Sequence, residues 1–309
     1  MEAPFISIVS PAYRAERILP ELVRRIKTSV EPITQNFEII LVEDCGPDDS
    51  WSVIQSLSEK EPRVRGFKLS RNYGQHYAIT CGLDQAQGDW IVVMDCDLQD
   101  QPEEIKKLYD KALEGYDVVL ARREERQDNF FKKLFSKLFY RTLGYLTGSK
   151  MDESIANFGI YHKSVIKSIT QLRESIRYFP TMVKWVGFRQ TSIKVEHAPR
   201  AEGETSYNFK KLLNLAIDII LAYSDKPIRL TIKAGFLVSF FALLIGLIYL
   251  IKYFSGDIIV PGYASLIVSI WFLSGLIITI LGVVGLYVGK TFEGVKQRPI
   301  YIISDTTND

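Results

Sequence analysis

The stretch WIVVMDCDLQD at residues 90–100 decides the fold, because it joins a short apolar run to a group of carboxylates. An apolar run of roughly four to eight residues bounded by polar ones is typical of a buried strand. This run ends at Asp95, and Asp97 and Asp100 follow it closely. Pro102 then opens a helix-length segment, as proline often does at the first position of a helix. The stretch therefore predicts a strand, an acidic loop and a helix in succession.

The three carboxylates of this loop predict a divalent metal. Closely spaced carboxylates either raise one another's pKa or are neutralised by a cation. Oxygen ligands suit Mg²⁺ or Mn²⁺, and magnesium commonly takes one or two protein carboxylates while substrate phosphates complete its shell. A lone Asp-x-Asp is usually part of a solvated loop. The position of this one, between an apolar strand and a helix, favours the metal site.

Similar apolar runs alternate with helix-length segments along the first 121 residues, which predicts an α/β fold with a largely parallel sheet. The other strand candidates are FISIVS (5–10), FEIILVED (37–44), VRGFKLS (64–70) and YDVVLA (116–121). The expected helices are residues 16–30, 48–61, 77–87 and 102–115. Ligands of such sheets lie at the carboxyl ends of the strands. Glu43-Asp44 and Asp95 to Asp97 are therefore expected to face one crevice.

The last third of the chain predicts attachment to a membrane. Residues 234–251 and 263–289 contain no charged side chain, and each is long enough for the roughly 20 residues that cross a bilayer. Residues 207–223 have helical apolar spacing typical of a helix lying at the membrane surface, although a soluble helix packed on the core has the same spacing. Lysine and arginine flank the outer ends of the two spans, which places both ends in the cytoplasm.

Composition excludes several classes of protein. With 47% hydrophobic and 24% charged residues the chain is not a disordered protein. Its 3 cysteines and 3 histidines are scattered, which argues against a disulfide framework and a zinc site and favours a reduced compartment. No signal peptide is visible at the N-terminus. No nucleic-acid partner is expected, and small residues in the second span would permit a homo-oligomer.

Motifs along nearly the whole chain resemble those of family 2 glycosyltransferases. The matching pieces are SIVSPAYRAE (7–16), ILVEDCGPDDS (40–50), LSRNYGQHYAITCGLDQAQGD (69–89), VVMDCDLQDQPE (92–103), VVLARREER (118–126), the GETSY run and the ending GLYVGKTFEGVKQRPIYII. The resemblance is greatest to bacterial polyprenyl-phosphate (undecaprenyl-phosphate) glucosyltransferases and dolichol-phosphate mannose synthases. It implies a GT-A fold, a divalent metal, and inverting transfer of one sugar from a nucleotide-sugar to a polyprenyl phosphate.

The resemblance also implies roles for individual residues. For the nucleotide-sugar it implies binding by Pro11, Tyr13, Glu16, Asp44 and Asp95. Asp97 would ligate the metal together with Asp95, and Gln99 would lie beside the sugar. Each residue also has an ordinary structural interpretation: Pro11 can end a strand, Glu16 can cap a helix, and Asp44 can form a turn.

Basic residues after the fifth strand candidate are expected to meet phosphate oxygens, since guanidinium groups bind phosphate through paired hydrogen bonds. Arg122 is placed with the catalytic residues. Those expected to bind the acceptor phosphate are Arg123, Arg126, Arg200, Ser206 and Tyr207. A solvated basic loop is the alternative for the arginines at 122–126.

Two positions depart from the family pattern. The run Tyr13-Arg14-Ala15-Glu16 replaces the common Tyr-Asn-Glu, so Glu16 is shifted by one position from that pattern. Asn157 stands where related enzymes often have an aspartate that has been considered a catalytic base. An acceptor phosphate with a second pKa near 6 is already mostly dianionic at neutral pH, so it can attack without a base.

The predicted organisation is a cytosolic GT-A domain at 1–205, an interface helix and linker at 206–229, two transmembrane helices at 230–290 and a cytosolic tail at 291–309. The expected activity is transfer of one sugar, with UDP-glucose favoured, to a polyprenyl phosphate at the inner membrane. GDP-mannose or a modified sugar is the first alternative. A glycolipid synthase and a non-catalytic docking protein are the others.

Overall fold

The computed structural model describes residues 4–123, 155–174, 176–196, 224–255 and 262–307. The chain divides into two compact units. The first comprises residues 1–140, 151–207 and 298–309, and the second comprises residues 141–150 and 208–297. Of the predicted segments, the amphipathic stretch 207–223 lies outside the described residues.

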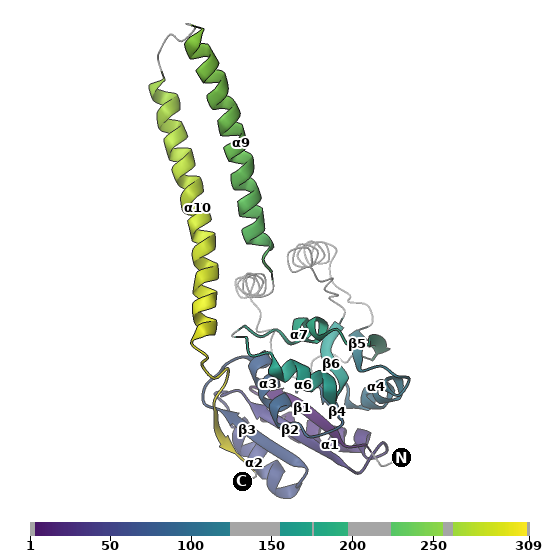
Figure 1. Ribbon diagram of the computed structural model, residues 1–309. Helices are drawn as coiled ribbons and strands as arrows, with labels where there is room; N and C mark the ends of the chain where they lie inside the picture. The colour runs from purple at the N-terminus through teal and green to yellow at the C-terminus, as the bar shows by residue number, and fades with distance from the viewer. Residues whose placement is uncertain (1–3, 124–154, 175, 197–223, 256–261, 308–309) are drawn as a thin grey trace. The chain divides into compact units, whose positions relative to one another are not determined.

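The first unit contains an 8-stranded sheet, counted over the described residues, with the order β7-β5-β6-β4-β1-β2-β3-β8 (Figure 1). Its strands are β1 (Ile6–Ala12), β2 (Phe37–Glu43), β3 (Val64–Leu69), β4 (Trp90–Val93), β5 (Val118–Arg123), β6 (Ile155–His162), β7 (Gln190–Val195) and β8 (Ile303–Thr306). All five predicted strands are present. The sheet is mixed, because β6 and β8 run antiparallel to their neighbours.

Helices cover both faces of this sheet. One face carries α1 (Leu19–Val30), α2 (Ser50–Lys60) and α4 (Ile105–Ala112), and the short 3₁₀ helix η1 (Pro102–Glu104) leads into α4. The other face carries α3 (Gln75–Gln85), α6 (Lys163–Gln171) and α7 (Phe179–Val186). The result is a three-layer α/β/α arrangement, which buries both faces of a mostly parallel sheet.

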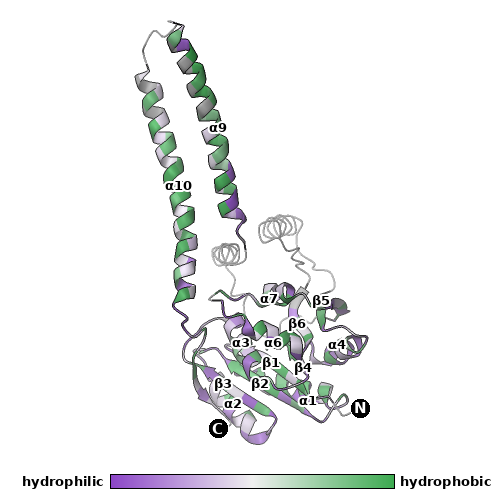
Figure 2. Cartoon of the chain, in the orientation of Figure 1, coloured by the Kyte–Doolittle hydropathy of each residue, from purple (hydrophilic) through white to green (hydrophobic). Residues whose placement is uncertain are grey.

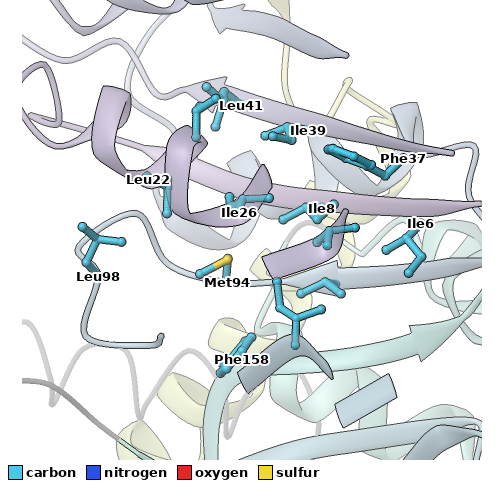
Figure 3. Close-up of a cluster of buried hydrophobic side chains, with 14 of the residues drawn as sticks. Ile6, Ile8, Leu22, Ile26, Phe37, Ile39, Leu41, Met94, Leu98 and Phe158 are labelled. Carbon is cyan, nitrogen blue, oxygen red and sulfur yellow. The ribbon is translucent and has the colours of Figure 1, made fainter. Parts of the chain in front are cut away.

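The buried core explains why the sequence pattern found the strands. β1 and β2 are buried at every position, as expected for strands covered on both faces. Figure 3 shows Leu22 and Ile26 of α1 against Ile8 and Ile39 of the two strands. Removing such side chains from water stabilises the fold by about 1.5–3 kcal/mol each.

The second unit contains two long helices, α9 (Lys226–Phe254) and α10 (Tyr263–Val295), which cover the two predicted spans. Apolar residues dominate both helices (Figure 2). Among the described residues, one segment meets the criteria for a membrane span: Ser269–Val295, with a mean hydropathy of 2.2 and none of it buried. That segment supports the second predicted span. The first span stays a prediction.

Element boundaries differ from the expected organisation at two places. Residues 226–229, expected in the linker, begin α9. The tail, expected as a separate segment at 291–309, is partly integrated into the catalytic unit. Arg298–Asp309 belong to the first unit and supply β8, which pairs with β3. A strand of four residues was missed because ISDT has no apolar run.

Candidate functional site

Both acidic clusters lie at the same edge of the sheet, as the sequence predicts. β1 pairs in parallel with β2 on one side and β4 on the other, so all three end together. Glu43, the last residue of β2, lies opposite Ala12, the last residue of β1. Just after β4, the backbone N–H of Met94 donates a hydrogen bond to the Val9 carbonyl of β1 at 3.1 Å. Two strand spacings place β2 and β4 about 10 Å apart. That separation suits a ligand that extends across the end of β1.

Asp44 holds the loop that follows β3. Its side chain is 3% exposed, and its two oxygens accept the backbone N–H groups of Tyr73 and Gly74, each at 2.8 Å. Burial raises the pKa of Asp44, while these hydrogen bonds and the Arg71 guanidinium act in the opposite direction. Each carboxylate oxygen has a second lone pair, so Asp44 can also accept a hydrogen bond from a ligand.

The acidic loop after β4 is built around a residue in a left-handed conformation. Leu98 has a φ of 57°, which is uncommon for residues other than glycine. Its side chain is 6% exposed and belongs to the same hydrophobic core cluster as Met94 (Figure 3). Between Met94 and Leu98 the loop carries Asp95 and Asp97, which lie at the partly exposed edge. The buried Leu98 therefore fixes the acidic loop.

The two carboxylates of this loop are held in different ways. Asp95 Oδ1 accepts a hydrogen bond from Gln75 Nε2 at 2.6 Å. Asp97 Oδ1 accepts the backbone N–H of Gln99 at 3.1 Å, which closes a local Asx turn. Both side chains are half-buried. Gln99 thus lies next to the second carboxylate, and its position beside the sugar stays a prediction.

The residues after β1 have mixed positions. Pro11 is buried within β1, and Tyr13 is 42% exposed with the Arg14 guanidinium 5.6 Å from its ring centre. Glu16 Oε2 accepts the Asp49 N–H at 3.0 Å, and the Glu16 N–H donates to Asp48 Oδ2 at 3.2 Å. Glu16 therefore links the loop after β1 to the start of α2, which is the capping interpretation of this residue.

The residues expected at the far side of the site are only partly described. Arg122 is exposed at the end of β5, and Arg123 is the last residue of that strand. Asn157 is half-buried in β6, which begins at the sheet edge where β4 ends, because the two strands are antiparallel. Arg126, Arg200, Ser206 and Tyr207 lie outside the described residues.

The acidic loop fits a cation that takes part of its coordination shell from a ligand. Among the described residues no group of three or more His, Cys, Asp and Glu side chains is arranged to hold a metal. Asp95 and Asp97 supply two carboxylates at a partly exposed edge, and Mg²⁺ is commonly bound by one or two carboxylates together with substrate phosphates. This donor set therefore fits Mg²⁺ or Mn²⁺ bound together with a diphosphate.

The segment that organises both acids was not predicted from the sequence. Tyr73 and Gly74 bind Asp44, and the next residue, Gln75, binds Asp95. Gly74 has a φ of 105°, a conformation that favours glycine, so its peptide N–H can point at the carboxylate. The motif RNYGQ was visible as part of the family resemblance. Its role depends on contacts between strands that a single sequence does not display.

The first turn of α3 is also supported from the side of α7. Arg177 is 3% exposed, and its Nε donates to Thr80 Oγ1 at 2.7 Å. Thr80 Oγ1 in turn donates to the His76 carbonyl at 2.8 Å. Burial lowers the pKa of His76 to about 4, and the Arg177 charge adds to the shift, so the imidazole is neutral at pH 7.

Comparison with known proteins agrees with this geometry. The model of the family described as Glycosyl transferase family 2 matches residues 7–170. The glycosyltransferase YkcC of Bacillus subtilis is 38% identical over 298 residues, which covers 96% of this chain and 92% of that protein. The undecaprenyl-phosphate 4-deoxy-4-formamido-L-arabinose transferase of Photorhabdus laumondii is 34% identical over 307 residues, covering 98% and 94%.

Solved structures show the same fold. Glucosyl-3-phosphoglycerate synthase of Mycobacterium tuberculosis, in complex with Mn²⁺, UDP-glucose and phosphoglyceric acid, superposes with a TM-score of 0.53 and 14% identity. The match covers 71% of this chain and 78% of that one. The mixed sheet of the first unit is therefore a GT-A fold. Given the family match and relatives that align over almost their full length, the chain is an enzyme of glycosyl transferase family 2.

Proposed function

We propose that this enzyme transfers one sugar, with inversion, from a nucleotide-sugar to the phosphate of a membrane polyprenol. Undecaprenyl phosphate is the favoured acceptor. The observation that carries the proposal is the match to undecaprenyl-phosphate 4-deoxy-4-formamido-L-arabinose transferases over 98% of the chain. That match includes α9 and α10 as well as the catalytic unit. An acceptor embedded in the bilayer accounts for a catalytic domain that carries an apolar helix.

The sheet edge supports a nucleotide-sugar as the donor. Asp44 lies at the end of β2 and can accept a hydrogen bond from the base, while Asp95 and Asp97 lie two strands away. The spacing of about 10 Å between these strands matches a ligand with a base at one end and a diphosphate at the other. Mg²⁺ or Mn²⁺ bound by Asp97 and Asp95 would neutralise charge on the departing nucleoside diphosphate.

Asn157 and the basic residues support a proposal for how the acceptor binds and attacks. Asn157 cannot take a proton, so the dianionic phosphate of the acceptor attacks unaided, and the side chain orients the sugar or the acceptor. The acceptor phosphate is assigned to Arg123, Arg126, Arg200, Ser206 and Tyr207, with Arg122 beside the reacting groups. The protein would then work at the inner membrane with its catalytic domain in the cytoplasm.

The sugar is a modified or amino sugar in this proposal, since the relatives are named for 4-deoxy-4-formamido-L-arabinose. The donors to compare with it are UDP-glucose, which the resemblance to polyprenyl-phosphate glucosyltransferases favours, and GDP-mannose. Discrimination among them depends on whether buried polar groups of the pocket meet the sugar hydroxyl and amide groups.

The test is transfer of radiolabelled sugar to undecaprenyl phosphate by the full-length protein in lipid vesicles, with Mn²⁺ or Mg²⁺. The donors are UDP-4-deoxy-4-formamido-L-arabinose, UDP-glucose and GDP-mannose. The proposal expects one labelled lipid product that is lost in Asp97→Ala. A product built on another lipid would indicate a glycolipid synthase. The absence of transfer from every donor would favour a docking protein.

A further inference from the structure

Two consecutive residues of the C-terminal tail form hydrogen bonds with one segment of the catalytic unit, one at each end of that segment. The segment is residues 70–84, which comprises the loop after β3 and nearly all of α3. At its start, the Ser70 N–H donates to the Ile302 carbonyl at 2.9 Å. At its end, the Tyr301 hydroxyl donates to Asp84 Oδ2 at 2.6 Å. The tail thus spans the segment from one end to the other.

The same segment carries the groups that hold the two acids of the donor site. The N–H groups of Tyr73 and Gly74 bind Asp44, and Gln75 Nε2 binds Asp95. Only four residues separate Ser70, which the tail holds, from Gln75. A shift of the loop would therefore move the hydrogen bonds of both carboxylates together.

The tail is itself anchored to the sheet beyond Ile302. β8 pairs with β3, and Thr307 Oγ1 accepts the Gly66 N–H at 2.8 Å while the Thr307 N–H returns a bond to the Gly66 carbonyl at 3.1 Å. A Cβ at Gly66 would lie 2.7 Å from Thr307 Cγ2 and 2.3 Å from Ile54 Cγ2, so a glycine is needed for this close packing. Trp51 Nε1 also donates to Asp305 Oδ2 at 3.1 Å.

The far end of the segment is fixed from a second side. Arg173 forms a bidentate pair with Asp84, at 2.8 and 2.9 Å, so this carboxylate joins α3 both to the tail and to the residues after α6. Paired hydrogen bonds of this kind add geometric specificity as well as energy. Tyr301 and Arg173 together restrain the end of α3 from two directions.

We propose that Tyr301 and Ile302 are positioning residues for the nucleotide-sugar site. By holding residues 70–84 on both sides, the tail keeps Asp44 and Asp95 in their binding geometry before the donor arrives. A loop held in place in the free enzyme does not have to be ordered on binding, which improves affinity without any new contact to the ligand. This inference rests on the proposed donor site at Asp44 and Asp95.

The experiment uses the full-length protein and Tyr301→Phe, which keeps the ring and removes the hydrogen bond to Asp84. Tyr109→Phe on α4, at the opposite face of the sheet, is the matched control. In Tyr301→Phe we expect KM for the donor, and Kd for UDP, to rise about 3-fold to 10-fold, with kcat for transfer changed less than about 2-fold. Amide exchange at residues 70–75 should quicken by a similar factor. Tyr109→Phe should leave all of these values unchanged.

A second variant, Arg173→Ala, removes the other partner of Asp84 and is expected to add to the donor effect of Tyr301→Phe. If Tyr301→Phe lowers the melting temperature while KM, Kd for UDP and exchange at 70–75 stay at the parent values, the contact is only structural and the inference is wrong. If the parent protein transfers no sugar, the proposed function fails. Exchange at 70–75 then still decides whether the tail orders the loop.

Discussion

Gln75 Nε2 donates a hydrogen bond of 2.6 Å to Asp95 Oδ1, although the two residues come from different strand-loop units of the sheet. The preceding residues, Tyr73 and Gly74, bond Asp44 through their backbone N–H groups. One short loop therefore sets the positions of carboxylates at the ends of two different strands. The proposed donor site depends on this loop as much as on the acids.

Gln75→Ala should lower kcat/KM for sugar transfer by about 10-fold, because a hydrogen bond to a charged acceptor is lost and Asp95 can turn away from its position. Gln75→Glu should be worse, since two carboxylates would then face each other. Steady-state kinetics with varied donor measures both. Gln85→Ala, at the other end of α3, is the control. Equal kinetics in Gln75→Ala and the parent would show that Asp95 needs no orientation.

Asp97→Ala should reduce transfer by about 10²–10³-fold, because the metal would lose a ligand at the group that carries the developing charge. Asp110→Ala is the control, since Asp110 is exposed on α4 and forms a surface ion pair with Lys106. Chelation of divalent metal by EDTA should abolish transfer, and added Mn²⁺ or Mg²⁺ should restore it. Full activity after chelation would contradict a role for the metal.

Asn157→Ala should leave the shape of the pH profile unchanged. If the acceptor phosphate attacks unaided, kcat falls below a pH of about 6 as the phosphate gains a proton, whatever residue stands at 157. Measurement of kcat from pH 5 to pH 9 with saturating undecaprenyl phosphate tests this. An acid limb that disappears on mutation of another carboxylate would identify a protein base instead.

Glu43→Gln should stabilise the fold at alkaline pH. Glu43 is 1% exposed, and burial raises the pKa of its carboxyl above the value in the unfolded chain. The folded state therefore holds this proton more tightly, so the wild-type protein loses stability as the pH rises through the interval between the two pKa values. The glutamine does not titrate and still offers an oxygen to the Gly46 N–H.

The expected result for Glu43→Gln is a higher melting temperature than wild type at pH 8, with a difference that shrinks toward zero as the pH falls below about 4. Thermal unfolding at several pH values measures it. Glu21→Gln, an exposed acid on α1, is the control and should show no stabilisation at pH 8. A difference that grows on acidification would contradict the raised pKa.

Glu16→Ala should lower the melting temperature by about 2–4 °C, because the Asp49 N–H at the start of α2 loses its acceptor. Glu16→Gln keeps an oxygen at this position and should restore the temperature. Donor KM, measured on the same proteins, separates the two interpretations of this residue. Restored stability with donor affinity still reduced would show that the carboxylate contacts the nucleotide-sugar.

The sequence predicted β1, β2 and β4 well because they are almost wholly buried between the helix layers and therefore appear as runs rich in apolar residues. It also predicted which acids meet at one edge, since parallel strands end together. It could not show that β6 enters between β4 and β5, because strand order is decided by contacts between distant residues. The predicted, largely parallel sheet is confirmed, and the antiparallel β6 and β8 make it a mixed one.

Within the candidate site, Asp44, Asp95 and Asp97 were predicted from their positions at strand ends and from the family resemblance, whereas Gln75 was not. Its importance arises from a hydrogen bond to Asp95, which is 20 residues away in the sequence. A glutamine at the start of a helix does not by itself indicate a functional role. For Glu16 the sequence left open a ligand contact and a helix cap. The structure shows its bond to the start of α2, and the ligand contact stays a prediction.

β8 follows both α9 and α10 in the chain, so the ribosome completes the catalytic sheet only after both long helices have been made. Until then the edge of β3 is unpaired, and exposed strand edges promote association with other chains. A soluble fragment that ends before α9 has the same open edge permanently. A catalytic fragment that preserves the fold must instead join the end of the first unit to residues 298–307, with α9 and α10 removed between them.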